Sequence, residues 1–218
     1  MRQPILLTDV SHRYDGGRAS SLSLDRVSVD FPAGSVTALV GANGSGKSTL
    51  LGILAGTLRP AHGRVTGMPR TVALVPQHSA APNLFPVTVR NTVAMGRWRD
   101  RGLLLPLTRR DQGIIDRAME RAGVTDLSHR TLAGLSGGQR QRTLIAQGLA
   151  QQAPLLLLDE PLSAVDAATA ELITRAVAEE KDAGTTVVIA THDPAQAAGA
   201  DRVLTLDHGR ITHGKTSS

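Results

Sequence analysis

The chain of 218 residues contains no cysteine, and its only aromatic residues are one tryptophan, one tyrosine and two phenylalanines. Without cysteine it forms neither disulfides nor thiolate metal sites, so a reducing compartment is compatible with it. The scarcity of aromatic residues argues against a surface that stacks nucleic-acid bases. No stretch approaches the roughly 18 to 20 apolar residues that span a bilayer, and the first residues lack the apolar core of a signal peptide. We therefore expect a chain that is soluble by itself and that binds no nucleic acid.

The charge of the chain is basic but not concentrated. Lys and Arg number 24 against 19 Asp and Glu, which gives a formal net charge of +5. The basic residues are mostly arginines without a long Lys/Arg run. Nucleic acid, an anionic membrane surface and a nucleotide would all suit such a charge, and a solvated surface explains it as simply. The charge alone therefore identifies no partner.

The apolar pattern changes twice along the chain. The first 75 residues contain strand-like segments, whereas apolar residues from about 87 to 152 recur with a helical period. Strand and helix signals then alternate again, and the last residues, 214–218, are expected to be frayed. The length suits one substantial α/β domain. We predict a core of residues 1–86 and 153–218 that is divided by an inserted helical subdomain of residues 87–152.

A glycine-rich loop lies between an apolar run and a helical pattern. Its sequence fills every fixed position of the phosphate-loop (Walker A) pattern G-x-x-x-x-G-K-[ST], which a plain glycine-rich turn would not require. Glycines permit a tight turn whose N–H groups point at phosphate oxygens, and the following helix adds its positive dipole end. Lys47 is expected to reach the β- and γ-phosphates, and the Ser48 hydroxyl to bind Mg²⁺. The nucleotide-binding residues expected here are Gly41, Ala42, Asn43, Gly44, Ser45, Gly46, Lys47, Ser48 and Thr49.

Two carboxylates follow a second apolar run, Leu155 to Leu158. They are Asp159 and Glu160, at the point where a strand buried on both faces would end. Open α/β sheets place their ligands at this carboxyl edge. A solvated acidic turn would look the same, but the phosphate loop upstream favours a Walker B pattern. We expect Asp159 to hold Mg²⁺ through water and Glu160 to act as general base toward the attacking water.

The segment Leu135-Ser136-Gly137-Gly138-Gln139 matches the signature motif of ABC (ATP-binding cassette) proteins. With the two preceding patterns, it makes the chain resemble that family over nearly its whole length. A plain helix start is the alternative, because Ser136 suits an N-cap; the dipole of that helix would equally favour a phosphate. The resemblance implies an α/β P-loop NTPase fold, an ABC cassette with a RecA-like core, an N-terminal antiparallel β region and an inserted α-helical subdomain.

Four more residues stand where the ABC family has functional ones. Tyr14 is similar to the adenine-stacking aromatic, with a buried core tyrosine as the alternative. Gln77 resembles the Q-loop glutamine, which contacts Mg²⁺ and water, although a loop amide without a role is also possible. His192 resembles the switch histidine at the γ-phosphate, with a structural histidine as the alternative. Asp166 resembles the D-loop aspartate, although Val165 replaces the more usual Leu, and an N-cap by Asp166 is compatible with that role.

The resemblance also implies how the site is assembled and used. ATP would close a head-to-tail homodimer in which the phosphate loop of one subunit and the signature of the other enclose each nucleotide. Hydrolysis would proceed in line, and product release would reopen the dimer. The signature residues expected to contact the partner's ATP are Ser136, Gly137, Gly138 and Gln139. The expected catalytic residues are Lys47, Gln77, Glu160 and His192. The expected Mg²⁺ ligands are Ser48, Gln77 and, through water, Asp159.

An ABC ATPase without a membrane span must pass its motion to another protein. Three kinds fit: a transporter subunit, a cytosolic ABC protein such as an iron–sulfur assembly ATPase or a translation factor, and an SMC-like DNA-maintenance ATPase. The heptads of a long coiled coil are missing, and one phosphate loop and one signature are present where translation-type factors resemble two cassettes. We therefore predict a transporter subunit at the cytoplasmic side of the cell membrane, with a cytosolic ABC ATPase as the alternative.

The permease and the substrate are predicted from resemblance to part of the insertion. A membrane permease subunit would bind beside Gln77, where residues 82–89 and 95–98 are partly apolar, although these could equally pack the insertion's own core. Residues 85–97 are similar to the matching segment of metal-type importers for zinc, manganese or iron chelates. We predict import of a divalent metal, zinc or manganese, with a solute-binding protein in the same system; an ABC exporter is the alternative. The seven histidines do not help, because the ATPase subunit need not touch the substrate.

Overall fold

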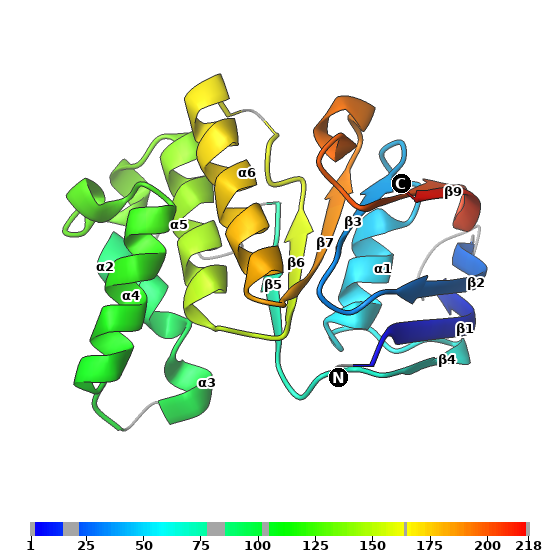
Figure 1. Cartoon of the computed structure of the whole chain (residues 1–218), viewed down its shortest axis with the longest axis horizontal. Helices are drawn as coiled ribbons and strands as arrows, with labels where there is room; N and C mark the ends of the chain where they lie inside the picture. The colour runs from blue at the N-terminus through cyan, green and yellow to red at the C-terminus, as the bar shows by residue number, and fades with distance from the viewer. Residues whose placement is uncertain (1–2, 15–21, 78–85, 102–104, 164, 217–218) are drawn as a thin grey trace. The chain divides into compact units, whose positions relative to one another are not determined.

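The computed structural model describes residues 3–14, 22–77, 86–101, 105–163 and 165–216 (Figure 1). The chain forms two compact units. Unit 1 comprises Met1–Leu74, Pro154–Glu160 and Glu180–Ser218, and unit 2 comprises Val75–Ala153 and Pro161–Glu179. The division of the chain at residues 86 and 153 that the sequence suggests stays a prediction.

Unit 1 begins with a three-stranded antiparallel sheet. Its order is β2-β1-β4, with β1 paired to both neighbours. Most apolar residues of β1 and β2 are buried, as the rough alternation in the sequence predicts. The pattern has exceptions: Leu6 and Leu22 are exposed, and the polar Ser11 and His12 at the end of β1 are buried. The expected N-terminal antiparallel region is therefore confirmed. The strands are β1 (Ile5–Arg13), β2 (Leu22–Phe31) and β4 (His62–Thr66).

A second sheet has six strands in the order β5-β6-β7-β3-β8-β9. Strands β6, β7, β3 and β8 are parallel neighbours, and β9 returns antiparallel to β8 through a hairpin turn at residues 208–209. Strand β9 extends to Thr216, so the expectation of fraying from residue 214 is wrong for residues 214–216. The strands are β3 (Val36–Val40), β5 (Val72–Val75), β6 (Leu155–Asp159), β7 (Thr186–Thr191), β8 (Arg202–Asp207) and β9 (Arg210–Thr216).

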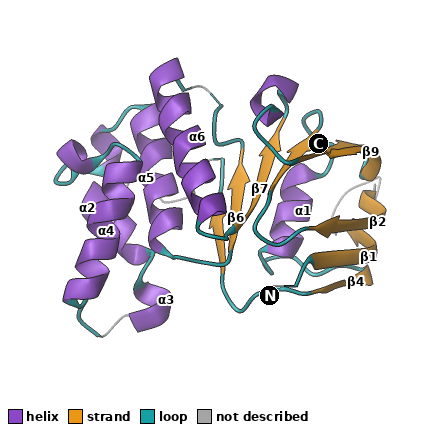
Figure 2. Cartoon of the chain, in the orientation of Figure 1, coloured by secondary structure: helices purple, strands orange, loops and turns teal. Residues whose placement is uncertain are grey.

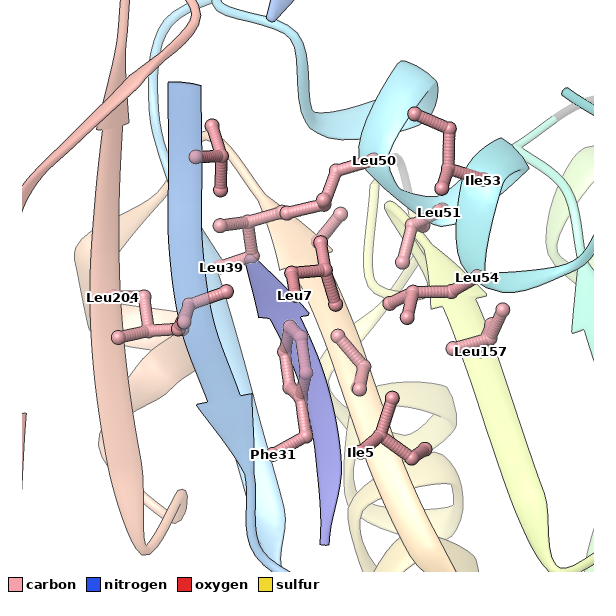
Figure 3. Packing of buried hydrophobic residues seen from close by; sticks show 14 of the residues in the cluster. Ile5, Leu7, Phe31, Leu39, Leu50, Leu51, Ile53, Leu54, Leu157 and Leu204 are labelled. Carbon is pink, nitrogen blue, oxygen red and sulfur yellow. The ribbon is translucent and has the colours of Figure 1, made fainter. Parts of the chain in front are cut away.

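The core of unit 1 lies where both sheets meet helix α1 (Lys47–Leu54). Figure 3 shows Phe31 of β2, Leu39 of β3 and Leu157 of β6 directed toward leucines of this helix. All of these side chains are buried. Both faces of β3 and of the apolar run of β6 are covered, so continuous apolar runs rather than alternation mark these strands. The helix that begins at the phosphate loop is thus anchored along its length in the main core.

Unit 2 is mainly helical (Figure 2). Helix α4 buries Ile114, Ile115, Ala118 and Met119 on one face, which confirms the helical period of this segment. Thr108 and Asp111 begin α4 with a capping box. The helices are α2 (Val89–Met95), α3 (Trp98–Arg101), α4 (Arg109–Arg121), α5 (Gly137–Ala150) and the first part of α6 (Ala167–Asp182), with short 3₁₀ turns at Thr125–Leu127 and Leu132–Gly134.

Arg97 belongs to an arginine-rich stretch of sequence, yet it is buried. Its side chain is 8% exposed, and its Nε donates to Asp111 Oδ1 at 3.2 Å. Its Nη1 donates to the carbonyl oxygen of Ala150 at 3.0 Å. One guanidinium thereby links the end of α2, the first turn of α4 and the last residue of α5. Arginine suits this place because its planar fork can satisfy several acceptors at fixed geometry.

We expect Arg97→Ala to destabilise the protein by about 3 kcal/mol, near the low end for breaking a buried ion pair. The reason is that Asp111 would remain buried without its cation, although Thr108 still donates to it from its backbone N–H and hydroxyl. Denaturant unfolding measures the loss. Arg109→Ala is the matched control, because Arg109 is exposed at the start of α4. Equal stabilities for the two variants would contradict the structural role of Arg97.

Within the described residues, none of the helices combines the length and the apolar character that crossing a lipid bilayer requires.

Candidate nucleotide-binding site

The strand register of unit 1 gathers the predicted phosphate-loop and catalytic residues at one edge. Val40 of β3 lies opposite Thr191 of β7, and Asp159 of β6 lies opposite Ala190. The chain therefore leaves all three strands at the same level: into the phosphate loop after β3, into Glu160 after β6 and into His192 after β7. Backbone hydrogen bonds extend the pairing one step beyond the strands, from Gly41 N to Thr191 O and from Glu160 N to Ala190 O. The carboxyl edge of the sheet is thus the candidate site.

The phosphate loop needs glycine at two crowded positions. A Cβ on Gly41 would lie 2.3 Å from the carbonyl oxygen of Leu206, and one on Gly46 would lie 2.4 Å from that of Ser23. Gly46 also has a φ of 108°, a backbone conformation that residues other than glycine rarely adopt. The loop is tied to the rest of unit 1 because Gly209 N donates to Ser45 O at 2.9 Å. These contacts explain why the fixed glycines of the motif cannot be replaced without moving backbone.

Helix α1 begins without a side-chain cap. Gly46 is its N-cap, no side chain caps its first N–H groups, and its first turn contains no acidic residue. An uncapped, positively polarised helix start next to a tight loop suits an anionic phosphate. Lys47 completes this environment from within, since its Nζ donates to the carbonyls of Gly41 at 2.7 Å and Ala42 at 3.0 Å. Ala42, Asn43, Gly44 and Ser48 are exposed.

Glu160 stands between the two other predicted catalytic side chains. Its Oε2 lies 2.7 Å from His192 Nδ1, and its Oε1 lies 3.8 Å from Lys47 Nζ. Glu160 is 3% exposed, whereas the His192 side chain is about half exposed. Oε1 is buried without a hydrogen-bond partner among the described residues. A buried carboxylate that is oriented by an imidazole and has an unused oxygen is suited to take a proton from a water molecule.

Asp159 and Ser48 adjoin each other beside this carboxylate. Burial is the largest influence and raises the pKa of Asp159 above its ordinary value, and the charge of Glu160 adds to the rise. A hydrogen bond with the Ser48 side chain and the charge of Lys47 act in the opposite direction. Asp159 Oδ1 is buried without a hydrogen-bond partner in the described part of the chain. A hydroxyl beside a carboxylate with an orphaned oxygen fits Mg²⁺, which prefers oxygen ligands and retains several waters.

We expect Asp159→Asn to raise the melting temperature of the nucleotide-free protein. A folded-state pKa above the unfolded value means that the folded state binds more protons between the two pKa values. Stability therefore falls as pH rises through that window, and the ionised carboxylate costs stability at neutral pH. The same variant should lose the Mg²⁺-dependent part of the stabilisation by ATP. Thermal unfolding with ATP, with and without Mg²⁺, tests both; a lower melting temperature combined with an unchanged Mg²⁺ effect would contradict the assignment. Asp126→Asn, at an exposed site in unit 2, is the control.

Tyr14 lies next to the phosphate-loop helix rather than in the core. It is 54% exposed, which excludes the alternative of a buried core tyrosine. Its hydroxyl is 3.2 Å from the hydroxyl of Thr49, the third residue of α1. Its ring packs edge to face with His12, with ring centroids 4.9 Å apart at 86°. An exposed ring fixed at the start of α1 is available to stack on a nucleotide base.

Unit 2 contains the signature residues at the start of α5. Ser136 is the N-cap, as predicted: its hydroxyl accepts from Gln139 N at 3.3 Å, and Gln139 Oε1 accepts from Ser136 N at 3.1 Å. Gly137 is exposed and Gly138 half-buried, and a Cβ on Gly138 would lie 3.9 Å from Val165. The first turn contains no acidic residue. This helix start therefore has the chemistry of a second anion site.

Asp166 caps helix α6, as the alternative reading of its sequence allowed. Its Oδ1 accepts from Thr169 N at 2.7 Å, and this backbone hydrogen bond is the main cause that lowers the pKa of Asp166. Arg142 of the signature helix contributes to the lowering through its charge. The aspartate remains exposed. Capping and a role at a nucleotide are compatible because the capping carboxylate is exposed.

Gln77 and the predicted permease surface are only partly described. Gln77 is exposed two residues beyond the end of β5, and residues 78–85 lie outside the described ones. Of the described candidates, Val89 and Arg97 are buried within unit 2, so they do not form a free surface and that part of the expectation is wrong. Trp98 is 42% exposed and remains a candidate for contact with a partner. The direct contact between Glu160 and His192 was not anticipated, although the adjacency of their strands' ends would have suggested it.

Comparison with known proteins gives consistent matches. A model of the ABC transporter family matches residues 24–163. The chain is 41% identical to the hemin import ATP-binding protein HmuV of Nocardia farcinica over 93% of this chain and 73% of that protein. It is 35% identical to the manganese transport system ATP-binding protein MntA of Synechocystis, covering 99% and 85%. It is 40% identical to the zinc transport system ATP-binding protein TroB of Treponema pallidum, covering 88% and 75%.

Solved structures agree with these relatives. A metal-chelate type ABC transporter in an inward-facing conformation superposes with a TM-score of 0.84 at 30% identity, covering 97% of this chain and 82% of that one. The dimeric cassette MJ0796 bound to ADP and phosphate superposes with a TM-score of 0.86 at 25% identity, covering 97% and 98%.

Proposed function

Because the chain belongs to the ABC transporter family and is an ATP-binding ATPase, we propose that it drives a metal-type importer through separate membrane subunits. The observation that carries the ATPase chemistry is the buried Glu160 between His192 and Lys47, at the edge where the phosphate loop begins. Import is supported by the relatives, which are named for the uptake or transport of hemin, manganese and zinc. No helix in the described residues is long and apolar enough to supply the membrane passage, so a separate permease is part of the proposal.

In this proposal the residues of unit 1, with Gln77 of unit 2, divide the work of hydrolysis. The N–H groups of the loop from Gly41 to Thr49 hold the phosphates, and Lys47 transfers its donors from the loop carbonyls to the phosphate oxygens. Glu160 accepts a proton from the attacking water while His192 keeps its carboxylate oriented and presents its other ring nitrogen toward the γ-phosphate. Ser48, Asp159 and Gln77 would hold Mg²⁺, Asp159 through water, and the ion when bound would neutralise phosphate charge.

The active assembly in this proposal is a head-to-tail homodimer. Ser136, Gly137, Gly138 and Gln139 of one subunit would contact the ATP bound by the other, and Asp166 would lie close to it. The helix start at Ser136 is suited to that role because it is exposed, polarised and free of acidic residues in its first turn. The dimeric cassette with ADP and phosphate supports the arrangement by similarity.

The substrate we propose is a divalent metal, zinc or manganese, as the relatives named for these metals suggest. Hemin is the second candidate, because a relative at 41% identity is named for hemin import. The system would include a permease that holds this subunit at the cytoplasmic side of the membrane, and a solute-binding protein that delivers the substrate. The ATPase subunit would contact neither metal nor hemin, so its own residues do not choose between them.

The test is isolation of the tagged full-length chain from native membranes in mild detergent. We expect a protein with many membrane spans and a solute-binding protein to copurify and to be identified by mass spectrometry. Elemental analysis of the solute-binding protein would then show zinc or manganese, and a haem absorption band would instead identify hemin. Recovery of soluble proteins alone would overturn the transporter function and favour a cytosolic ABC ATPase.

A further inference from the structure

His12 has an environment that its position in the strand does not require. It is 8% exposed at the end of β1, and its Nδ1 lies 2.9 Å from the carbonyl oxygen of Arg59. A carbonyl oxygen only accepts hydrogen bonds, so Nδ1 carries the proton and donates. The other ring nitrogen, Nε2, is buried without a hydrogen-bond partner among the described residues. A buried orphaned nitrogen of this kind calls for an explanation.

The imidazole makes one contact that points to a role. Its ring meets the ring of Tyr14 edge to face, at 4.9 Å between centroids and 86° between planes. The opposite end of Tyr14 is fixed as well, through the 3.2 Å contact of its hydroxyl with Thr49. His12 and Tyr14 thus form a connected pair, which the Arg59 carbonyl fixes at one end and the phosphate-loop helix fixes at the other.

We propose that His12 is a positioning residue for the base of the nucleotide, which it affects only by holding the Tyr14 ring upright. The inference rests on the proposed function, in which Tyr14 stacks on adenine. A half-exposed ring beside the phosphate loop would otherwise rotate about its side-chain bonds, and binding would have to order it. The hydrogen bond to Arg59 fixes the plane of the imidazole, and the edge-to-face contact passes that orientation to Tyr14.

The surroundings of His12 strengthen the argument. His12 and Arg59 both line a hollow of about 840 Å³ on the antiparallel sheet of unit 1. Removal of the imidazole would therefore enlarge this hollow and take away the ring that contacts Tyr14. A polar ring with an unpartnered nitrogen is also a poor choice for filling a core, where an apolar residue would cost less. The Arg59 carbonyl anchors the imidazole and the same ring contacts Tyr14, so the geometry favours a positioning role for His12.

The test compares binding of ADP, which contains the base, with binding of pyrophosphate, which does not, to the wild type and to variants of the full chain. Neither ligand is hydrolysed, so calorimetry measures equilibrium affinity. Tyr14→Ala should weaken ADP by about 5- to 150-fold, the range of base stacking on an aromatic residue. His12→Ala should weaken ADP by about 2- to 10-fold, the range for an aromatic pair. Pyrophosphate affinity should be unchanged in both.

Two further variants separate the ring from the hydrogen bond. His12→Asn retains a donor for the Arg59 carbonyl but has no ring, and it should bind ADP as weakly as His12→Ala. His12→Phe retains the ring but loses the hydrogen bond that fixes its plane, so its ADP affinity should lie between those of the wild type and His12→Ala. Because Tyr14 is the only tyrosine, incorporated fluorotyrosine gives one ¹⁹F signal, and this signal should move toward that of free fluorotyrosine in His12→Ala.

Each remaining outcome overturns the inference. An unchanged ADP affinity in His12→Ala, with a weakened one in Tyr14→Ala, removes His12 while leaving the Tyr14 platform in place. Equal losses for ADP and pyrophosphate in His12→Ala would show a general structural role. If Tyr14→Ala itself binds ADP normally, the base platform and the role of His12 both fail, whereas the phosphate site of the proposed function is judged separately by the pyrophosphate affinity.

Discussion

Glu160→Gln is expected to bind ATP with nearly wild-type affinity and to lose turnover by about 10²- to 10⁴-fold, the usual contribution of a general base. The amide has the shape of the carboxylate, and its oxygen still accepts from His192 Nδ1, so the site should keep its geometry. The amide cannot take a proton from water. Steady-state phosphate release and equilibrium ATP binding measure the two effects separately.

The same variant should reveal the proposed dimer. With hydrolysis blocked, ATP remains bound and the closed state accumulates, so light scattering should show a dimer with ATP and a smaller species without it. Glu171→Gln is the matched control, because Glu171 is an exposed glutamate of α6 that forms an ion pair with Arg175 four residues away. Turnover of Glu160→Gln at the control's rate would remove Glu160 from the role of base.

Much of the phosphate site could be predicted from the sequence because its chemistry is local. The loop from Gly41 to Thr49 is contiguous, and its glycines are dictated by contacts and torsion angles that no other residue tolerates. Asp159 and Glu160 follow a run of leucines whose burial on both faces is itself a sequence signal. Parallel pairing then brings these ends together without further information. Local pattern and sheet register were therefore sufficient for this part.

Other features depend on partners that lie far apart in the sequence. The sequence shows Arg97 only as one member of an arginine-rich stretch, and the proximity of Asp111 and Ala150 shows that it is buried and paired. His12 has the same character, since its anchor is the carbonyl of Arg59, 47 residues later. The nearness of Tyr14 was readable in principle, because residues two apart on a strand share a face. The sequence does not show the third partner in either group, which is Ala150 for the pair Arg97–Asp111 and Arg59 for the pair His12–Tyr14.

The phosphate loop itself contains the charge that the phosphates require. Lys47 is 5% exposed, and two of its three donors are occupied by carbonyls of the loop itself. The third side of the ammonium group faces Glu160 at 3.8 Å. Binding of ATP would thus exchange loop carbonyls for phosphate oxygens around a cation that is already in the site. The loop is therefore preorganised electrostatically for a polyphosphate.

Lys47→Ala should therefore weaken ATP binding by about 3 to 6 kcal/mol, from the loss of two hydrogen bonds between charged groups at about 1.5 to 3 kcal/mol each. A second cause adds to the first, because the Glu160 carboxylate would face the incoming phosphates without its neighbouring cation. The double variant with Glu160→Gln tests this second cause: it should recover part of the lost affinity, since contacting residues do not act additively. Calorimetry with ATP measures all three proteins, and Arg64→Ala, at an exposed position on β4, controls for the loss of one positive charge. A Lys47→Ala protein that binds ATP like this control would exclude Lys47 from the phosphate site, and a double variant no better than the single one would show that Glu160 does not repel the nucleotide.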